Sequence, residues 1–372
     1  MSSPSRTSSL SSVNEGFGGS RSYGSGAVGR SSDMCGTLPR MARTLTQRDL
    51  NRALLARQGL LERHDAPLAR VLQRIGGIQA QYAPSMYIGL WSRVKDLERD
   101  AVTQGLERRS LIQATLMRST IHLVAKADYW PLALAIRDGR RTWWRRATKR
   151  TIDMDAAAET ARRALAGGPL KRAELEALVG KDAFHGLGLW LDMVRVPPSG
   201  TWERRRADLY GLAETWIGPP REEPGLLVRR YLQGFGPSTP QEIASFAGLT
   251  VKELNLDLDL RRFTAEDGAE LLDVPRAALP GDVYAPPRFL PTWDATLLVH
   301  ARRAMVIREE DRPRIFNTKL PQSLPTYLID GTAAGTWRYE NGRVELDPWY
   351  AHGDREALEE EGRVLAQYLG DQ

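Results

Sequence analysis

The chain has almost none of the residue types that build disulfides or thiolate metal sites, because its 372 residues include one cysteine, Cys35. A single cysteine excludes a disulfide, a cysteine-based zinc site and an iron–sulfur cluster within one chain, and it is typical of a reducing compartment. The five histidines are scattered, and none has a second histidine or a cysteine at ligand spacing. We therefore expect no metal and no cofactor.

Long apolar runs are missing too. No stretch of about 18 apolar residues predicts a membrane helix, and the N-terminus has no apolar segment of the signal-peptide type. There is also no GxSxG, no Walker loop and no GxGxxG, so serine hydrolases, P-loop NTPases and dinucleotide enzymes have no motif here. These absences predict a cytoplasmic protein with no membrane partner.

The charge that is present is positive, with a formal net charge of +6 and a pI near 9.5. An excess of this sign suits an anionic partner, either nucleic acid or an acidic membrane surface. Arginine far outnumbers lysine, which favours bidentate phosphate contacts but is equally typical of a GC-rich genome. Charge alone leaves these alternatives open.

The pattern along the chain predicts an α+β protein in which one kind of unit recurs. In each unit the pattern predicts helices followed by a β-hairpin, which is the composition of a winged helix. In the third unit, IASFAGLTVKEL has the small residue and Gly248 expected between the two helices of a helix-turn-helix. The predicted divisions are a disordered Ser/Gly-rich tail (1–42), three winged-helix units (43–150, 151–222 and 223–282) and a β-rich C-terminal region with a final helix (283–372).

The stretch GGIQAQYAP (76–84) places two glutamines, Gln79 and Gln81, one residue apart after a glycine pair. The preceding PLARVLQRI has helical spacing, and Gly76 and Gly77 are good helix terminators. Ile78 to Gln81 should therefore be extended, so that both amides point to the same side. Spacing alone favours a structural role, in which the pair satisfies backbone groups in an irregular turn, and a further observation is needed to favour a functional one.

Several segments resemble one known family. GGIQAQYAPSMYIGLWSR, ATLMRSTIHLV, WDATLLVHARR and LIDGTAAGTWR are similar to the winged-helix DNA glycosylases that include the azinomycin-resistance enzyme AlkZ, and the likeness spans about residues 43 to 370. The Gln, small residue, Gln element of that family matches Gln79, Ala80 and Gln81. The resemblance implies three tandem winged helices in a C-shaped arrangement.

The resemblance also implies the chemistry. It implies a monofunctional DNA glycosylase that excises N7- or N3-alkylated purines from double-stranded DNA, in some members from interstrand crosslinks, with Gln79 and Gln81 catalytic. Such an enzyme would associate with the nucleoid through DNA, and we expect a monomer. The expected DNA contacts are Arg93, Arg118 and His122 in the family-like stretches, and Arg204, Arg205 and Arg206 in the predicted second wing.

Each of these residues has a structural alternative. Arg93 and Arg118 could form internal ion pairs, and His122 could be a core histidine. At the level of function, tandem winged helices serve a non-catalytic DNA-binding protein or transcriptional regulator as well as an enzyme, and an inactive family member could retain the motif. What favours an enzyme is the glutamine pair, which a regulator does not need.

Overall fold

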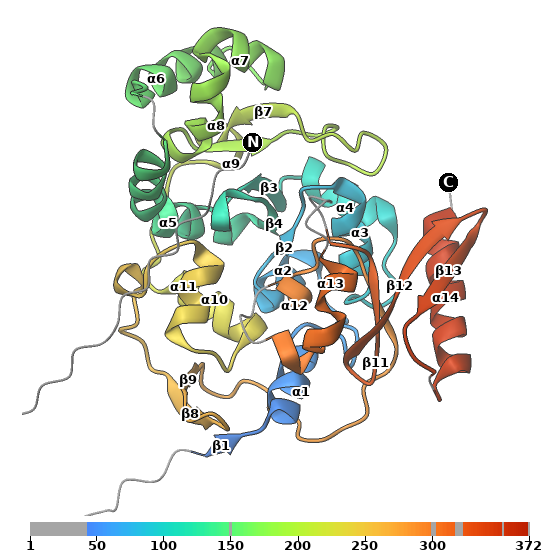
Figure 1. Cartoon of the computed structure of the whole chain (residues 1–372). Helices are drawn as coiled ribbons and strands as arrows, with labels where there is room; N and C mark the ends of the chain where they lie inside the picture. The colour runs from blue at the N-terminus through green and yellow to red at the C-terminus, as the bar shows by residue number, and fades with distance from the viewer. Residues whose placement is uncertain (1–42, 149–150, 299–302, 317–322, 352, 371–372) are drawn as a thin grey trace, which may run out of the picture. The chain divides into compact units, whose positions relative to one another are not determined.

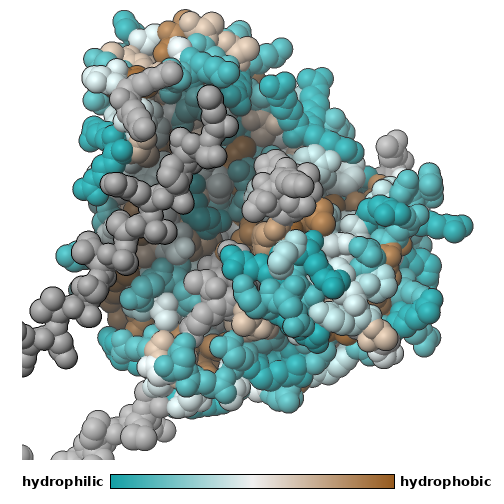
Figure 2. All heavy atoms as spheres, in the orientation of Figure 1, coloured by the Kyte–Doolittle hydropathy of each residue, from teal (hydrophilic) through white to brown (hydrophobic). Residues whose placement is uncertain are grey.

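Figure 1 shows the computed structural model of the chain, which describes residues 43–148, 151–298, 303–316, 323–351 and 353–370. The predicted tail lies outside the described residues. Residues 42–372 cluster as one compact unit, and their mixture of helices with three sheets confirms the α+β class. The largest core cluster contains residues from Leu54 to Ala333, and the face drawn in Figure 2 is largely hydrophilic.

The N-terminal third contains helices followed by a hairpin, as the winged-helix pattern predicts. The elements are β1 (Thr44–Leu45), α1 (Gln47–Arg57), α2 (Leu68–Ile75), β2 (Ile78–Gln79), α3 (Ala83–Trp91), α4 (Arg99–Glu107), β3 (Leu111–Thr115), η1 (Met117–Ser119), β4 (Ile121–Ala125) and α5 (Lys126–Ala147). The Thr46 cap of α1 forms a capping box with Asp49, as its sequence predicts. Helix α3 was not predicted; every residue in it is buried, so it lacks the polar face that marks a surface helix.

The second stretch also ends in a hairpin. Its elements are α6 (Met154–Leu165), β5 (Leu170–Lys171), α7 (Arg172–Val179), α8 (Lys181–Trp190), β6 (Met193–Arg195), β7 (Leu209–Leu212) and α9 (Ala213–Ile217). Strand β6 pairs with both β7 and β3, so the two hairpins share one six-stranded sheet of order β2-β4-β3-β6-β7-β5. The loop between β6 and β7 is the segment predicted as the second wing.

The third stretch departs from the prediction at one point. Its elements are α10 (Leu226–Phe235), α11 (Pro240–Ala247), η2 (Val251–Glu253), β8 (Arg261–Ala265) and β9 (Glu270–Asp273). The expected second helix of the helix-turn-helix is only the single 3₁₀ turn η2. Thr250 and Glu253 form a capping box that starts a helix, but the Asn255 side chain then accepts a hydrogen bond from the Asp257 backbone, a local alternative to helix.

The C-terminal region is β-rich, as predicted. Its elements are β10 (Arg288–Leu290), α12 (Ala295–Leu298), η3 (Arg303–Met305), η4 (Glu309–Asp311), α13 (Arg312–Ile315), β11 (Thr326–Ile329), β12 (Thr332–Glu340), β13 (Arg343–Pro348) and α14 (Arg355–Gly370). Its four strands lie in the order β10-β11-β12-β13. The Asp330-Gly331 and Asn341-Gly342 dipeptides both have positive φ at both residues, the geometry of a type I′ hairpin turn, for which Asp-Gly and Asn-Gly are preferred sequences.

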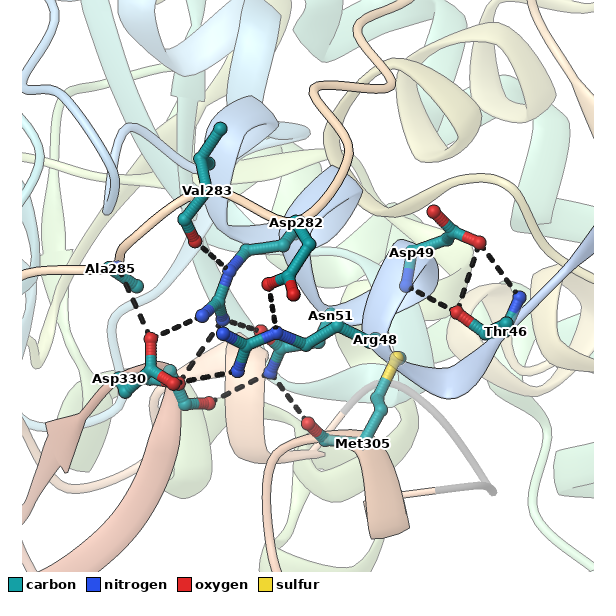
Figure 3. Close-up of polar contacts among 11 residues, drawn as sticks. Thr46, Arg48, Asp49, Asn51, Asp282, Val283, Ala285, Met305 and Asp330 are labelled. Atoms are coloured by element: carbon teal, nitrogen blue, oxygen red, sulfur yellow. Dashed lines mark hydrogen bonds and ion pairs between the residues drawn. The ribbon is translucent and has the colours of Figure 1, made fainter.

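A polar network ties α1 to the β11–β12 turn (Figure 3). Arg52 is fully buried, and its guanidinium pairs with the carboxylate of Asp330 and donates to the Val283 carbonyl at 2.5 Å. Arg48 bridges Asp330 and Asp282 at 2.7 and 2.6 Å. The turn therefore supplies the carboxylate that a buried cation needs.

Replacing Asp330 with Asn should cost about 1–3 kcal/mol of unfolding free energy, because Arg52 stays buried without a carboxylate. Asn tolerates the positive φ of the turn, so the substitution removes charge and little else. The matched change Asp282→Asn, at an exposed partner of Arg48, should cost no more than about 0.5 kcal/mol. Urea unfolding of the two variants compares them, and equal losses would show that Arg52 does not depend on Asp330.

Candidate active site at Gln79 and Gln81

The glutamine strand begins where α2 ends. Gly76 and Gly77 have φ of 78° and 81°, in the left-handed region that side-chain-bearing residues avoid. Strand β2 then pairs antiparallel with β4, which places Gln79 opposite His122. The prediction that the glycines end the helix and start an extended segment is confirmed.

The two glutamines contact each other. Gln79 Nε2 donates a hydrogen bond to Gln81 Oε1, while Ala80 between them is fully buried and its backbone N–H bonds Ile121 O at 2.7 Å. Gln79 is 4% exposed, whereas Gln81 is exposed. The pair thus joins one buried amide to one that solvent reaches. The prediction that both amides point to the same side is confirmed by their hydrogen bond.

Arg118 holds the inner glutamine. It lies at the tip of the β3–β4 hairpin with φ 53°, and its Nη2 donates to Gln79 Oε1 at 3.1 Å. Its Nη1 donates to the carbonyl of Phe246 in α11 at 2.9 Å, and the guanidinium lies 5.3 Å from the Phe246 ring centre. Burial lowers the pKa of Arg118. No carboxylate among the described residues pairs with it.

Gln113 supports the same segment from the neighbouring strand. It is 1% exposed, and its Nε2 donates to the Ala80 carbonyl at 3.2 Å. A Cβ on Gly200, in the β6–β7 loop, would lie 2.3 Å from Gln113 Oε1, so the loop backbone packs directly on this amide. Gln113 was not predicted as a site residue; a glutamine within the otherwise apolar strand LIQAT is the signal that could have identified it.

The β6–β7 loop also reaches the motif through Tyr82, the residue after Gln81. Arg205 Nη1 donates to the Tyr82 hydroxyl at 3.4 Å, and Trp202 packs edge-on against Tyr87 of α3 at 5.6 Å. Arg204, Arg205 and Arg206 are all exposed. Arg206 forms an ion pair with Asp208 at 3.2 Å while remaining 80% exposed. All three arginines are therefore accessible, and Arg205 is the one next to the glutamines.

Comparison with known proteins adds the family. Residues 72–368 match the family described as DNA glycosylase AlkZ-like. The chain belongs to this AlkZ-like DNA glycosylase family. A solved structure of Streptomyces sahachiroi DNA glycosylase AlkZ superposes with a TM-score of 0.72 at 19% identity, covering 87% of this chain and 97% of that one. No curated protein matches the sequence significantly.

As a DNA glycosylase, the protein has DNA as its partner, and two of the predicted DNA contacts then need correction. Arg93 is 1% exposed, and its guanidinium donates to Asp294 at 2.8 Å, Thr296 at 3.0 Å and the Gly89 carbonyl at 2.9 Å. This is an internal ion pair, and its burial keeps the guanidinium from contacting a phosphate. Arg93 therefore stabilises the fold between α3 and the segment before α12.

His122 is the second correction. It is 2% exposed, with Nδ1 at 3.0 Å from the Thr120 carbonyl and its ring edge-on to Phe246 at 6.4 Å. Burial and then the charge of Arg118 lower its pKa to about 3. His122 is thus a neutral imidazole behind Gln79, and its cover keeps it from contacting DNA.

No group of three or more His, Cys, Asp and Glu residues that could hold a metal occurs in the described part of the chain. Nor does that part contain a helix long and apolar enough to cross a membrane.

His122 should make the protein less stable in acid. Because its folded pKa lies below its unfolded value near 6.5, its contribution is complete above pH 6.5 and is lost as pH falls toward 3. His122→Gln should remove up to about 1.4 kcal/mol per pH unit from the slope of unfolding free energy over that window. Denaturant unfolding from pH 7 to 4 measures the slope. An unchanged slope in His122→Gln, matching the exposed-site control His185→Gln, would contradict the assignment.

Proposed function

We propose that this DNA glycosylase hydrolyses the N-glycosidic bond of purines made cationic by alkylation at N7 or N3. The observation that carries the proposal is the hydrogen-bonded pair of amides at Gln79 and Gln81, one held by Arg118 and the other exposed. A cationic purine is already a good leaving group, so its release needs no strong general acid. No carboxylate among the described residues hydrogen-bonds either glutamine.

The glutamines act through their carbonyl dipoles. Departure of the base leaves an oxocarbenium-like sugar, as in glycoside hydrolysis. Two fixed carbonyl oxygens on one side of C1′ stabilise that positive charge and orient the attacking water. An amide does not titrate near neutral pH, so neither glutamine acts as a general base. Since the attacking group is water, the product is an abasic site in an uncut strand.

Arg118 has a positioning role in this mechanism. Its hydrogen bond fixes the orientation of the Gln79 amide, while its own charge opposes the positive sugar. Arg118 has no carboxylate partner among the described residues. Its charge is therefore left for a DNA phosphate close to the hairpin tip to offset. The exposed Arg204, Arg205 and Arg206 supply further phosphate contacts from the β6–β7 loop.

We assign the DNA-binding scaffold to three tandem winged-helix units, with divisions near residues 150, 222 and 282. The hairpins β3–β4, β6–β7 and β8–β9 support this reading. The third unit has a 3₁₀ turn in place of its recognition helix, so it is the least regular of the three.

Interstrand crosslinks through purine N7 are substrates under the same chemistry, because each crosslinked purine carries the same positive charge. Gln81 is exposed, and an amide that solvent reaches suits a bulky lesion that cannot be fully flipped out.

Gln79→Ala and Gln81→Ala should each lower the single-turnover rate of N7-methylguanine excision by about 10²–10³-fold, the effect of removing one preorganised stabilising group. The assay uses a duplex with one N7-methylguanine, followed by alkaline cleavage of abasic sites. Gln104→Ala, at an exposed glutamine of α4, is the matched control. Duplex binding by anisotropy should stay within about threefold in all three variants.

The substrate class is tested in the same assay. A neutral purine such as hypoxanthine, and unmodified guanine, should be released far more slowly than N7-methylguanine because each needs protonation to leave. Comparable rates for the neutral and cationic bases would rule out the mechanism. DNA binding without excision of N7-methylguanine or of an N7-crosslinked duplex would favour a non-catalytic DNA-binding protein.

A further inference from the structure

A second basic surface lies against α2, away from the residues of the glutamine site. A cavity of about 670 Å³ is bounded by one side of α2, by Arg230 and Gln233 of α10, and by the segment after β9 that carries Arg276. None of its lining residues forms a side-chain hydrogen bond with Gln79, Gln81 or Arg118. No acidic side chain lines it.

Three arginines at this cavity have no ion-pair partner among the described residues. Arg70 and Arg74 lie one turn apart on α2, and Arg276 faces them from the segment after β9. All three are exposed, and none of them hydrogen-bonds a carboxylate in the described part of the chain. Every other arginine of the cavity wall, by contrast, is paired: Arg57 with Asp273 and Arg230 with Asp128.

The wall beneath Arg276 is fixed and retains positive charge. Asp273 is a single buried carboxylate that pairs with two guanidiniums, Arg57 at 2.7 Å and Arg261 at 2.5 Å. The same two arginines donate to the carbonyls of Ala278 at 3.1 Å and Ala277 at 3.0 Å. These hydrogen bonds fix the backbone that follows Arg276. The group formed by Asp273, Arg57 and Arg261 keeps a net charge of +1.

The positive charge continues along α2 beyond this cavity. A neighbouring cavity of about 520 Å³ shares Arg70 and Gln73 and adds the exposed Lys126 at the start of α5. Together Arg276, Arg74, Arg70 and Lys126 form what we name the α2 basic track. The exposed carboxylates of Glu62 and Asp65, in the loop before α2, offset part of its charge.

We infer that the α2 basic track binds phosphate groups of the DNA backbone outside the glutamine site. Guanidinium groups bind phosphate oxygens in bidentate geometry, and their alignment across two adjoining cavities suits a chain of phosphates better than one isolated anion. The track gives the enzyme a second DNA-binding surface, which also binds undamaged DNA. Binding there does not depend on the excision reaction.

The test compares Arg74→Gln/Arg276→Gln with Lys95→Gln/Arg343→Gln, a control that removes the same charge at two exposed residues without ion pairs in the described part of the chain. Anisotropy measures binding of the full chain to an undamaged 40-base-pair duplex between 50 and 200 mM salt. Each lost phosphate contact reduces the log–log salt slope by about 0.9, so the track variant should lose about 1 to 2 units and the control none. Circular dichroism melting checks that both variants fold.

A second arm identifies the source of the phosphate. Pyrophosphate could raise the melting temperature of the wild type and the control but not of the track variant, while the DNA salt slope is the same in all three proteins. That result would show that the track binds phosphate but that its ligand is a small phosphorylated molecule and not DNA. Equal salt slopes together with equal pyrophosphate shifts in all three proteins would overturn the inference.

Discussion

The site depends on the way the chain leaves α2 at two consecutive glycines. A Cβ on Gly76 would lie 3.0 Å from the Phe235 ring, and one on Gly77 would lie 3.0 Å from the Val124 side chain. Both residues also have the left-handed φ that only glycine adopts freely. Packing from α10 on one side and β4 on the other therefore fixes the reversal that turns a helix into the glutamine strand.

Everything around the glutamines is then assembled from distant parts of the chain. The hairpin tip at Arg118 reaches Gln79, α11 reaches Arg118 through Phe246, and the β6–β7 loop reaches Tyr82 through Arg205. Gln113 links the motif to the β6–β7 loop, because its amide nitrogen donates to the Ala80 carbonyl and its amide oxygen packs against Gly200. The β6–β7 loop is thus held in place where it crosses the motif.

Local chemistry explains what the sequence could predict. The glycine pair that ends α2 acts within a few residues and was predicted correctly, and the Asp330-Gly331 and Asn341-Gly342 turns and the Thr46 cap are equally local signals. Helix α3, by contrast, is buried on all sides and has no amphipathic signal, and the burial of Arg93 depends on Asp294, 201 residues away. The single 3₁₀ turn at η2 was missed because the competing Asn255 hydrogen bond is invisible to helix propensity.

The same long-range pairing decides which arginines can bind DNA. A net charge of +6 counts Arg52, Arg57 and Arg93, yet these are buried with carboxylate partners and contribute no accessible field. Arginine content alone therefore cannot locate a DNA surface. The two DNA surfaces that we propose instead rest on arginines without an ion-pair partner among the described residues, Arg118 beside the glutamines and those of the α2 basic track. In both places the missing counter-charge is one that a phosphate backbone carries.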